Sequence, residues 1–222
     1  MSTHIKICGI RTPDVAAAAV EAGADMVGVV FVERSPRLVT LDEARAVAAA
    51  VSGRAEVVGL FKDASLDRVR QTAGRVPLSM LQLHGALAPA DVPHLRPTRW
   101  LRAVSFDPQT IEADLRAVDN LSRANENLAA VIIDTPDPSQ VGGGTGRAFD
   151  WPALRQVLDR LQPRTRVVLA GGLTPDNVAE AIAAVRPWMV DVSSGVESRR
   201  GEKDAALIQA FCEAARSAAS GD

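Results

Sequence analysis

The sequence predicts a single (β/α)8 barrel over residues 1–222. Short runs rich in Val, Ile, Leu and Met alternate with Ala-, Arg- and Glu-rich stretches at helical spacing, which is the pattern of parallel strands buried on both faces. Eight such pairs occupy the 222 residues, so each unit spans about 28 residues, close to the roughly 30 of one βαβ step. Eight steps of this kind close a parallel sheet into a barrel.

The expected strands are short apolar runs, and the expected helices lie between and after them. The strands are predicted over 5–8, 26–31, 57–61, 78–83, 100–104, 130–134, 167–170 and 189–192. The helices are predicted over 13–22, 41–51, 66–73, 89–95, 108–124, 151–161, 175–185 and 203–219. Six helices have an N-cap candidate, whose side-chain oxygen can accept from the first backbone N–H groups: Thr12, Thr40, Ser65, Asp107, Asp150 and Thr174. Pro13, Pro108 and Pro175 stand at first helical positions.

An open doubly wound sheet is the alternative fold. Such sheets usually have five or six strands and a Gly-rich turn after the first strand. Here the glycine clusters come late, at 142–146, 171–172 and 195, which favours the barrel. The longest irregular stretch, 135–149, follows the sixth expected strand, and a loop of that length inside a compact domain is usually functional.

Composition narrows the classes of partner. Lys plus Arg number 25 against 27 Asp plus Glu, a net charge of −2, so we expect no nucleic-acid partner. No stretch approaches the roughly 18 consecutive apolar residues of a membrane span. Cys8 and Cys212 are far apart, which suggests neither a disulfide framework nor a zinc site. This cysteine usage fits a reducing compartment, so we expect a cytoplasmic protein. We also expect no metal or other cofactor, because neither HExxH nor a clustered His–carboxylate set occurs.

Unusual residues gather where the expected strands end. Active sites of these barrels lie at the C-terminal ends of the strands. Those ends and the loops after them carry eight candidates: Cys8, Arg37, His84, Asp134, Gly171, Gly172, Ser194 and Gly195. Each alone has an ordinary structural explanation, but their placement at one rim predicts a functional site.

Three Gly- or Ser-rich turns follow the last three expected strands. Their backbone N–H groups can bind anions, and the loops after strands seven and eight form the recurrent phosphate site of these barrels. Gly172, Ser194 and Gly195 are therefore phosphate candidates, and the segment from Gly144 to Gly146 could close over them. The alternative is that these glycines only make tight turns.

Cys8 and Asp134 suit proton transfer. Lys6 shares a strand face with Cys8, and a nearby ammonium favours the thiolate. The alternatives are a thiol that packs as a small hydrophobe and a Lys6 buried in an ion pair with Asp191. Asp134 ends an apolar run, which favours a protonated carboxyl that can donate, or else it caps the following loop. A proton acceptor and a donor across a barrel mouth suit an isomerisation.

Two further side chains have both a functional and a structural interpretation. Arg37 could clamp a carboxylate through two parallel hydrogen bonds, although a surface salt bridge is the commoner fate of arginine. His84 could contact a ligand or only bond nearby backbone.

Taken together, the motifs resemble those of the phosphoribosylanthranilate isomerases of tryptophan biosynthesis. They run in the same order, from Lys6 to about Asp204: KICGI at 6–10, SPR at 35–37, LQLHG at 81–85, DT at 134–135, GGTG at 143–146, LAGGLTPDN at 169–177 and DVSSGVE at 191–197. Gly142 adds one glycine before the usual GGTG, and 136–141 is rich in proline.

The resemblance implies the Amadori rearrangement of N-(5′-phosphoribosyl)anthranilate to 1-(2-carboxyphenylamino)-1-deoxyribulose 5-phosphate. Asp134 would be the general acid at the furanose ring oxygen, Cys8 the general base at C2′, and Arg37 the partner of the anthranilate carboxylate. The remaining residues of the expected substrate-binding set are His84, Gly144, Gly146, Gly171, Gly172, Asp191, Ser194 and Gly195. The implied partner is this small substrate, and the implied assembly is a monomer or a homodimer.

Two other functions stay open. A non-catalytic phosphosugar-binding barrel would keep the phosphate turns without the chemistry, but the presence of both Cys8 and Asp134 argues against it. A different phosphosugar isomerase would use paired carboxylates or a metal, and too few His and acidic residues stand at the strand ends for that. A related barrel acting on a histidine precursor usually employs two Asp residues, which Cys8 disfavours.

Overall fold

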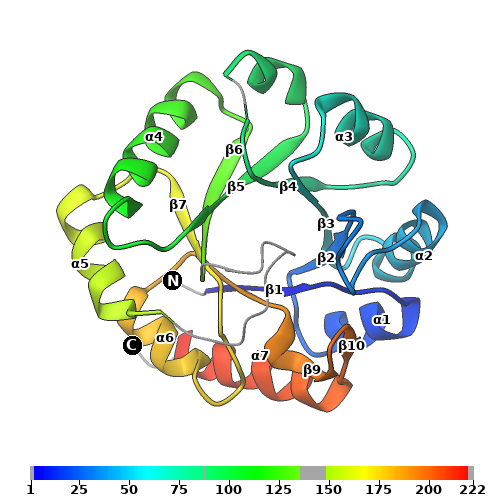
Figure 1. The fold of residues 1–222 in the computed structure, drawn as a ribbon. Coiled ribbons are helices and arrows are strands. Elements are labelled where there is room, and N and C mark those ends of the chain that lie inside the picture. Colours follow the sequence, from blue (N-terminus) through cyan, green and yellow to red (C-terminus); the bar gives the residue numbers. More distant parts are fainter. Residues whose placement is uncertain (1–2, 88, 136–148, 220–222) are drawn as a thin grey trace.

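The computed structural model describes residues 3–87, 89–135 and 149–219. Eight parallel strands form a closed barrel in chain order (Figure 1), so the barrel is confirmed over the open sheet. The strands are β1 (His4–Cys8), β2 (Met26–Val30), β3 (Glu56–Lys62), β4 (Met80–His84), β5 (Arg99–Ser105), β6 (Leu128–Asp134), β7 (Arg166–Leu169) and β8 (Met189–Val192). β1 closes the barrel against β8, with Lys6 opposite Asp191.

Helices surround the barrel (Figure 1). They are α1 (Pro13–Glu21), α2 (Leu41–Val51), α3 (Leu66–Ala73), the 3₁₀ helix η1 (Pro89–Leu95), α4 (Ile111–Ala124), α5 (Trp151–Leu161), α6 (Val178–Val185), the 3₁₀ helix η2 (Ser194–Val196) and α7 (Ala205–Ala219). The short strands β9 (Glu197–Arg199) and β10 (Glu202–Lys203) form a hairpin before α7. No described helix has the length and apolar character needed to span a membrane.

Side-chain capping explains three of the helix starts that were predicted correctly, whereas Thr12 precedes α1 without a side-chain capping bond. Thr40 and Glu43 form a reciprocal capping box, and Ser65 and Asp150 each accept from the backbone N–H three residues ahead. α4 starts at Ile111 rather than 108, because Asp107 accepts from Gln109 N in the preceding turn.

Three other expected helices differ from the structure. α6 starts at Val178 rather than 175, after a turn in which Thr174 N donates to Asn177 Oδ1. The expected helix over 89–95 is a 3₁₀ helix with Pro93 inside it, where proline supplies no N–H for an α-helical bond. The last helix starts at Ala205 rather than 203, because the β9–β10 hairpin ends at Lys203.

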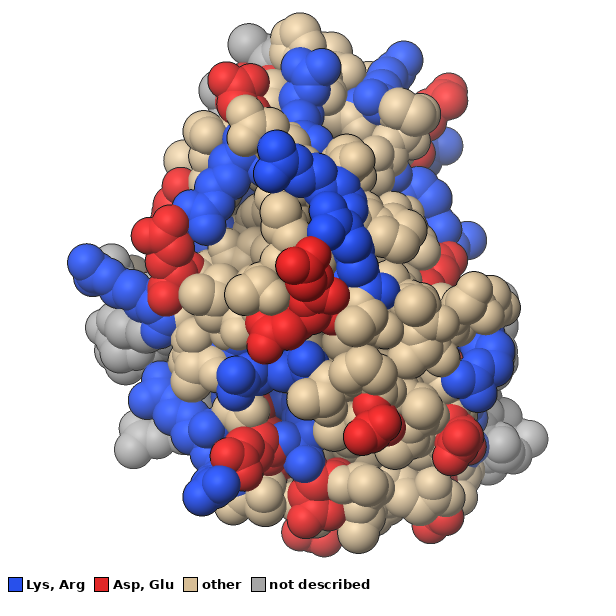
Figure 2. Space-filling model, turned by 90° about the vertical axis from the view of Figure 1, so that its right-hand side faces the viewer, with Lys and Arg blue, Asp and Glu red and all other residues tan. Residues whose placement is uncertain are grey.

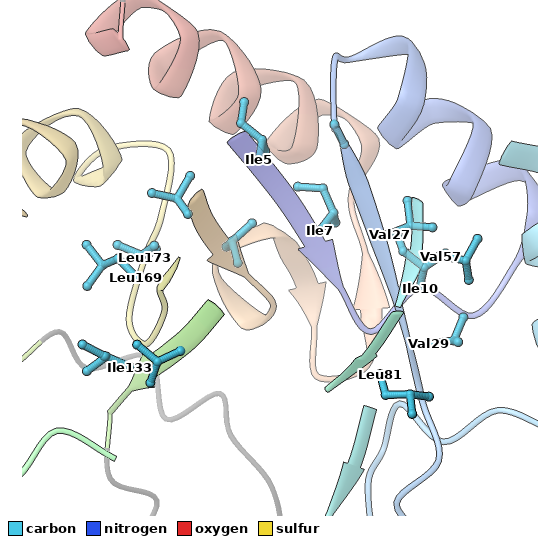
Figure 3. Close-up of a cluster of buried hydrophobic side chains, with 14 of the residues drawn as sticks. Ile5, Ile7, Ile10, Val27, Val29, Val57, Leu81, Ile133, Leu169 and Leu173 are labelled. Atoms are coloured by element: carbon cyan, nitrogen blue, oxygen red, sulfur yellow. The ribbon is translucent and has the colours of Figure 1, made fainter. Parts of the chain in front are cut away.

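Side-chain alternation along the strands sorts the core into two layers. One cluster packs between strands and helices and includes Ile5, Ile7, Val27 and Val29 (Figure 3). A second cluster includes Met26, Val58, Met80, Leu101, Ile132, Val168 and Met189. These residues alternate with the first set, so they fill the barrel interior. The same alternation directs Lys6, Cys8, Asp134 and Asp191 inward, above and among these side chains.

Charge on one face of the molecule is mixed. The face at the right of Figure 1, which carries α2 and α3, shows Lys and Arg side chains interspersed with Asp and Glu side chains (Figure 2).

Candidate active site

A cavity with about 720 Å³ of empty space opens where the strands end, and most of the predicted residues line it. They are Cys8, Arg37, His84, Asp134, Gly171, Gly172, Asp191 and Ser194. Gly195 does not line the cavity, and Gly144 and Gly146 lie outside the described residues. The structure thus brings eight of the predicted side chains and turns together from six strands of the barrel and the loops after them.

The Cys8 thiol is buried beside an ion pair. Lys6 is fully buried, and its Nζ donates to Asp191 Oδ2 at 2.8 Å. The Lys6 ammonium also interacts electrostatically with the nearby Cys8 thiol, so the ion-pair alternative and the thiol interaction coexist. Burial raises the pKa of Cys8, while the Lys6 ammonium opposes that rise without cancelling it. The expectation that Lys6 favours the thiolate is correct in sign, but burial outweighs it.

Gly28 makes room for this arrangement. It pairs with Cys8 across β1 and β2. A Cβ at position 28 would lie 2.9 Å from Cys8 Sγ and 3.3 Å from Lys6 Nζ, so any side chain here would displace the thiol. Sequence analysis missed this role, although a glycine inside a strand is a signal of close approach.

Asp134 ends β6 and faces the same cavity. Its Oδ1 accepts from Thr135 N at 2.8 Å, so the loop-capping alternative is also realised. Gly171, with φ +84°, packs against this turn, because a Cβ there would lie 2.8 Å from Asp134 Oδ1. The turn after β7 therefore packs against the Asp134 carboxyl group and limits its movement.

The turns after β7 and β8 pack directly on each other. A Cβ at Gly195 would lie 1.8 Å from the carbonyl oxygen of Leu173, so only glycine permits this contact. Within the described chain, the backbone N–H groups of Gly172, Leu173 and Ser194 donate to no other group. These donors meet the requirement for binding an anion.

Arg37 is held by a carboxylate from the far end of the chain. Its Nε and Nη2 donate to Glu197 Oε1 and Oε2 at 2.7 and 2.8 Å. The two side chains are only 4% and 3% exposed, so the salt bridge is buried rather than on the surface. Burial opposes ionisation of Glu197, but the bonds from Arg37 and Lys203 and from Gly201 N lower its pKa to about 2.

His84 is neutral in this environment. Burial and the positive charges of Lys6, Lys62 and Arg102 lower its pKa to about 3. Gln82 Nε2 lies 2.8 Å from His84 Nε2. If the amide donates, the imidazole proton is on Nδ1. His84 therefore offers the cavity a polar but uncharged group.

Several lining residues escaped sequence analysis. Val30, Val32 and Leu60 form an apolar wall, and Lys62 and Gln82 add polar groups beside it. The inward alternation of β3 and β4 was the available signal for Leu60, Lys62 and Gln82. Among the described residues, no group of three His, Cys, Asp or Glu side chains is placed to hold a metal ion.

Comparison with known proteins agrees with this geometry. The family model described as N-(5'-phosphoribosyl)anthranilate (PRA) isomerase matches residues 5–214. The isomerase of that name from Thiobacillus denitrificans is 44% identical over 220 residues, covering 97% of this chain and 99% of that protein. The Pseudomonas fluorescens (strain Pf0-1) protein of the same name is 44% identical over 214 residues, covering 95% and 97%.

Solved structures give the same result. The Thermotoga maritima phosphoribosyl anthranilate isomerase has a TM-score of 0.82 at 33% identity, covering 97% of this chain and 99% of that one. An isomerase solved in complex with reduced 1-(o-carboxyphenylamino)-1-deoxyribulose 5-phosphate has a TM-score of 0.80 at 31% identity, with the same coverage. The chain therefore belongs to the N-(5′-phosphoribosyl)anthranilate isomerase family and is an isomerase of tryptophan biosynthesis.

Proposed function

We propose that Cys8 and Asp134 carry the two proton transfers of the Amadori rearrangement of N-(5′-phosphoribosyl)anthranilate. The observation that supports this most is that a thiol from β1 and a carboxyl group from β6 line one cavity together with the paired turns after β7 and β8. An acid and a base held on opposite sides of a bound sugar are what a hydrogen shift between neighbouring carbons needs.

The reaction proceeds in two proton steps. Asp134 donates a proton to the furanose ring oxygen, the C1′–O bond breaks, and the anthranilate nitrogen lone pair forms an iminium at C1′. The Cys8 thiolate then removes the proton from C2′, and the C–H electrons form the enolamine. Tautomerisation of the enolamine gives the ketone. Lys6 stabilises the thiolate through its nearby positive charge.

The phosphate and the anthranilate carboxylate of the substrate bind different groups of the site. The N–H groups of Gly172, Leu173 and Ser194 donate to phosphate oxygens, and Arg37 meets the anthranilate carboxylate. Asp191 Oδ1 is buried and has no hydrogen-bond partner among the described residues, so it accepts from a ribose hydroxyl. The aromatic ring of the anthranilate lies along the apolar wall of Val30, Val32 and Leu60.

Steady-state kinetics of Cys8→Ala and Asp134→Asn test these roles. N-(5′-phosphoribosyl)anthranilate is formed in situ from anthranilate, and its conversion is followed by fluorescence. Each variant should lose at least about 100-fold in kcat with little change in KM. Cys212→Ala is the matched control, because Cys212 is a second buried, unpaired cysteine, located in α7.

Two outcomes would contradict the proposal. Wild-type turnover in either variant would remove that residue from its role. No turnover by the wild-type enzyme at high concentration would instead favour a phosphosugar-binding barrel. The cytoplasmic location stays a prediction. The monomeric or dimeric state also stays a prediction; one similar structure is of monomers generated from the dimeric isomerase of Thermotoga maritima.

A further inference from the structure

The β9–β10 hairpin, drawn in orange in Figure 1, contacts the loop that carries Arg37. Gly201, in the hairpin turn, lies so close to Pro36 that a Cβ would meet its carbonyl oxygen at 2.9 Å. The Arg37 stem then passes over Gly9, where a Cβ would lie 2.5 Å from Arg37 Cδ. The hairpin thus contacts the backbone before Arg37 through Gly201 and the guanidinium through Glu197.

Groups of the protein use all the hydrogen-bond acceptor positions of the Glu197 carboxylate. Its carboxylate accepts from Arg37 Nε and Nη2, from Lys203 Nζ at 2.5 Å, and from Gly201 N at 3.0 Å. An ionised carboxylate has about four acceptor positions, so these four bonds saturate it. Neither Glu197 nor Lys203 lines the cavity. These two residues hold other groups in place and do not touch a ligand.

Lys203 connects the hairpin to the turn after β8. Its Nζ donates to the Ser193 carbonyl oxygen at 3.0 Å and lies 3.4 Å from Ser193 Oγ. Ser193 and its neighbour Ser194 both line the cavity. One buried ammonium thus joins the carboxylate that orients Arg37 to the turn that faces the ligand.

The cluster carries one unbalanced charge. Arg37 and Lys203 both donate to Glu197, the single carboxylate between them, and all three side chains are at most 4% exposed; burial lowers the pKa of Lys203, and the charge of Glu197 opposes this. A buried charge without a counterion is unfavourable. Glu197 uses two of the five guanidinium donors of Arg37, and the other three bond to nothing in the described chain. An anion in the cavity would complete the pairing.

We propose that Glu197 and Lys203 are positioning residues that fix the Arg37 guanidinium for the carboxylate of the substrate, so that the hairpin makes the enzyme selective for a carboxylated aromatic amine. The inference rests on the proposed function. Because Glu197 already holds one edge of the guanidinium, Arg37 loses little rotamer freedom when its other edge binds the substrate carboxylate. The fixed position then favours ligands whose carboxylate matches it.

Binding of two probes to the intact enzyme tests this. The first is reduced 1-(o-carboxyphenylamino)-1-deoxyribulose 5-phosphate, and the second is the same molecule without its carboxyl group. The wild-type enzyme should bind the first roughly 10- to 100-fold more tightly, the range expected for hydrogen bonds to a charged group. Glu197→Gln should reduce this ratio at least about fivefold and leave the affinity for the second probe within about twofold.

A second variant separates position from folding. Glu197→Asp keeps all three charges but withdraws the carboxylate by one methylene, so the fold should persist while the ratio still falls. Glu202→Gln is the matched control, because Glu202 lies on the same hairpin in a solvent-exposed pair with Arg199. This variant should keep the wild-type ratio.

Three results would overturn the proposal. They are a wild-type enzyme that does not distinguish the probes, Glu197 variants that keep the wild-type ratio, and variants that weaken both probes equally, which indicates a purely structural role. Failure of the proposed function is visible separately, as a wild-type enzyme that does not turn over N-(5′-phosphoribosyl)anthranilate, and it would overturn both proposals.

Discussion

Replacing Gly28 with alanine would push a methyl group against the Cys8 thiol. The new Cβ would stand 2.9 Å from Sγ, 3.1 Å from Cys8 Cα and 3.3 Å from Lys6 Nζ. Non-bonded heavy atoms prefer about 3.5–4.0 Å, so Sγ must retreat by roughly 0.6–1 Å. Overpacking of this kind costs about 1–3 kcal/mol of stability. A displacement of about 1 Å at a reacting group lowers kcat by about 100-fold.

Gly59→Ala separates the effect on the thiol from the effect on packing. Gly59 is also a strand glycine, on β3, and its Cβ would lie 2.6 Å from Leu78 Cδ1, the end of a flexible side chain. Urea unfolding gives the stability of both variants, and the fluorescence assay gives kcat. We expect both to lose stability but only Gly28→Ala to lose turnover. If Gly28→Ala kept the wild-type kcat, or lost no more than Gly59→Ala, the thiol position would not control the reaction.

Three further outcomes follow from the site. His84 should remain neutral from pH 8 to pH 5 in an NMR titration, because its pKa is lowered from 6.5 to about 3, and protonation near pH 6.5 would contradict its burial. The pKa of Glu197 is lowered from 4.5 to about 2, so its contribution to the unfolding free energy is present above pH 4.5 and lost as the pH falls toward 2. Urea titrations at several pH values should show that Glu197→Gln flattens this slope. In Gly195→Ala, the new Cβ would meet Leu173 O at 1.8 Å and separate the turns after β7 and β8. Steady-state kinetics should then show KM raised about tenfold or more. An unchanged KM would mean that these turns do not bind substrate.

Local signals explain what the sequence could predict. Short apolar runs located every barrel strand, and capping side chains such as Thr40 and Asp150 set the starts of α2 and α5. Seven of the eight candidates chosen because strand ends in a parallel barrel converge line the cavity. The remaining contacts join distant positions, such as Arg37 and Glu197, which are 160 residues apart. Nothing near either residue encodes that pairing, because it depends on barrel closure and on a hairpin that replaces the expected start of the last helix.

In the proposed complex, the Lys6 ammonium would couple substrate binding to the basicity of Cys8. Its Nζ donates to Asp191 Oδ2, and it lies near the thiol; the Asp191 charge raises the pKa of Cys8 while the Lys6 charge lowers it. Asp191 Oδ1 is buried and has no hydrogen-bond partner among the described residues. In the proposed complex a ribose hydroxyl donates to Oδ1 and draws negative charge away from the Lys6 side of the carboxylate. Lys6 then interacts more strongly with Cys8, and the positive charge of the iminium acts in the same direction. Both changes in the proposed complex therefore oppose the rise that burial causes in the pKa of Cys8.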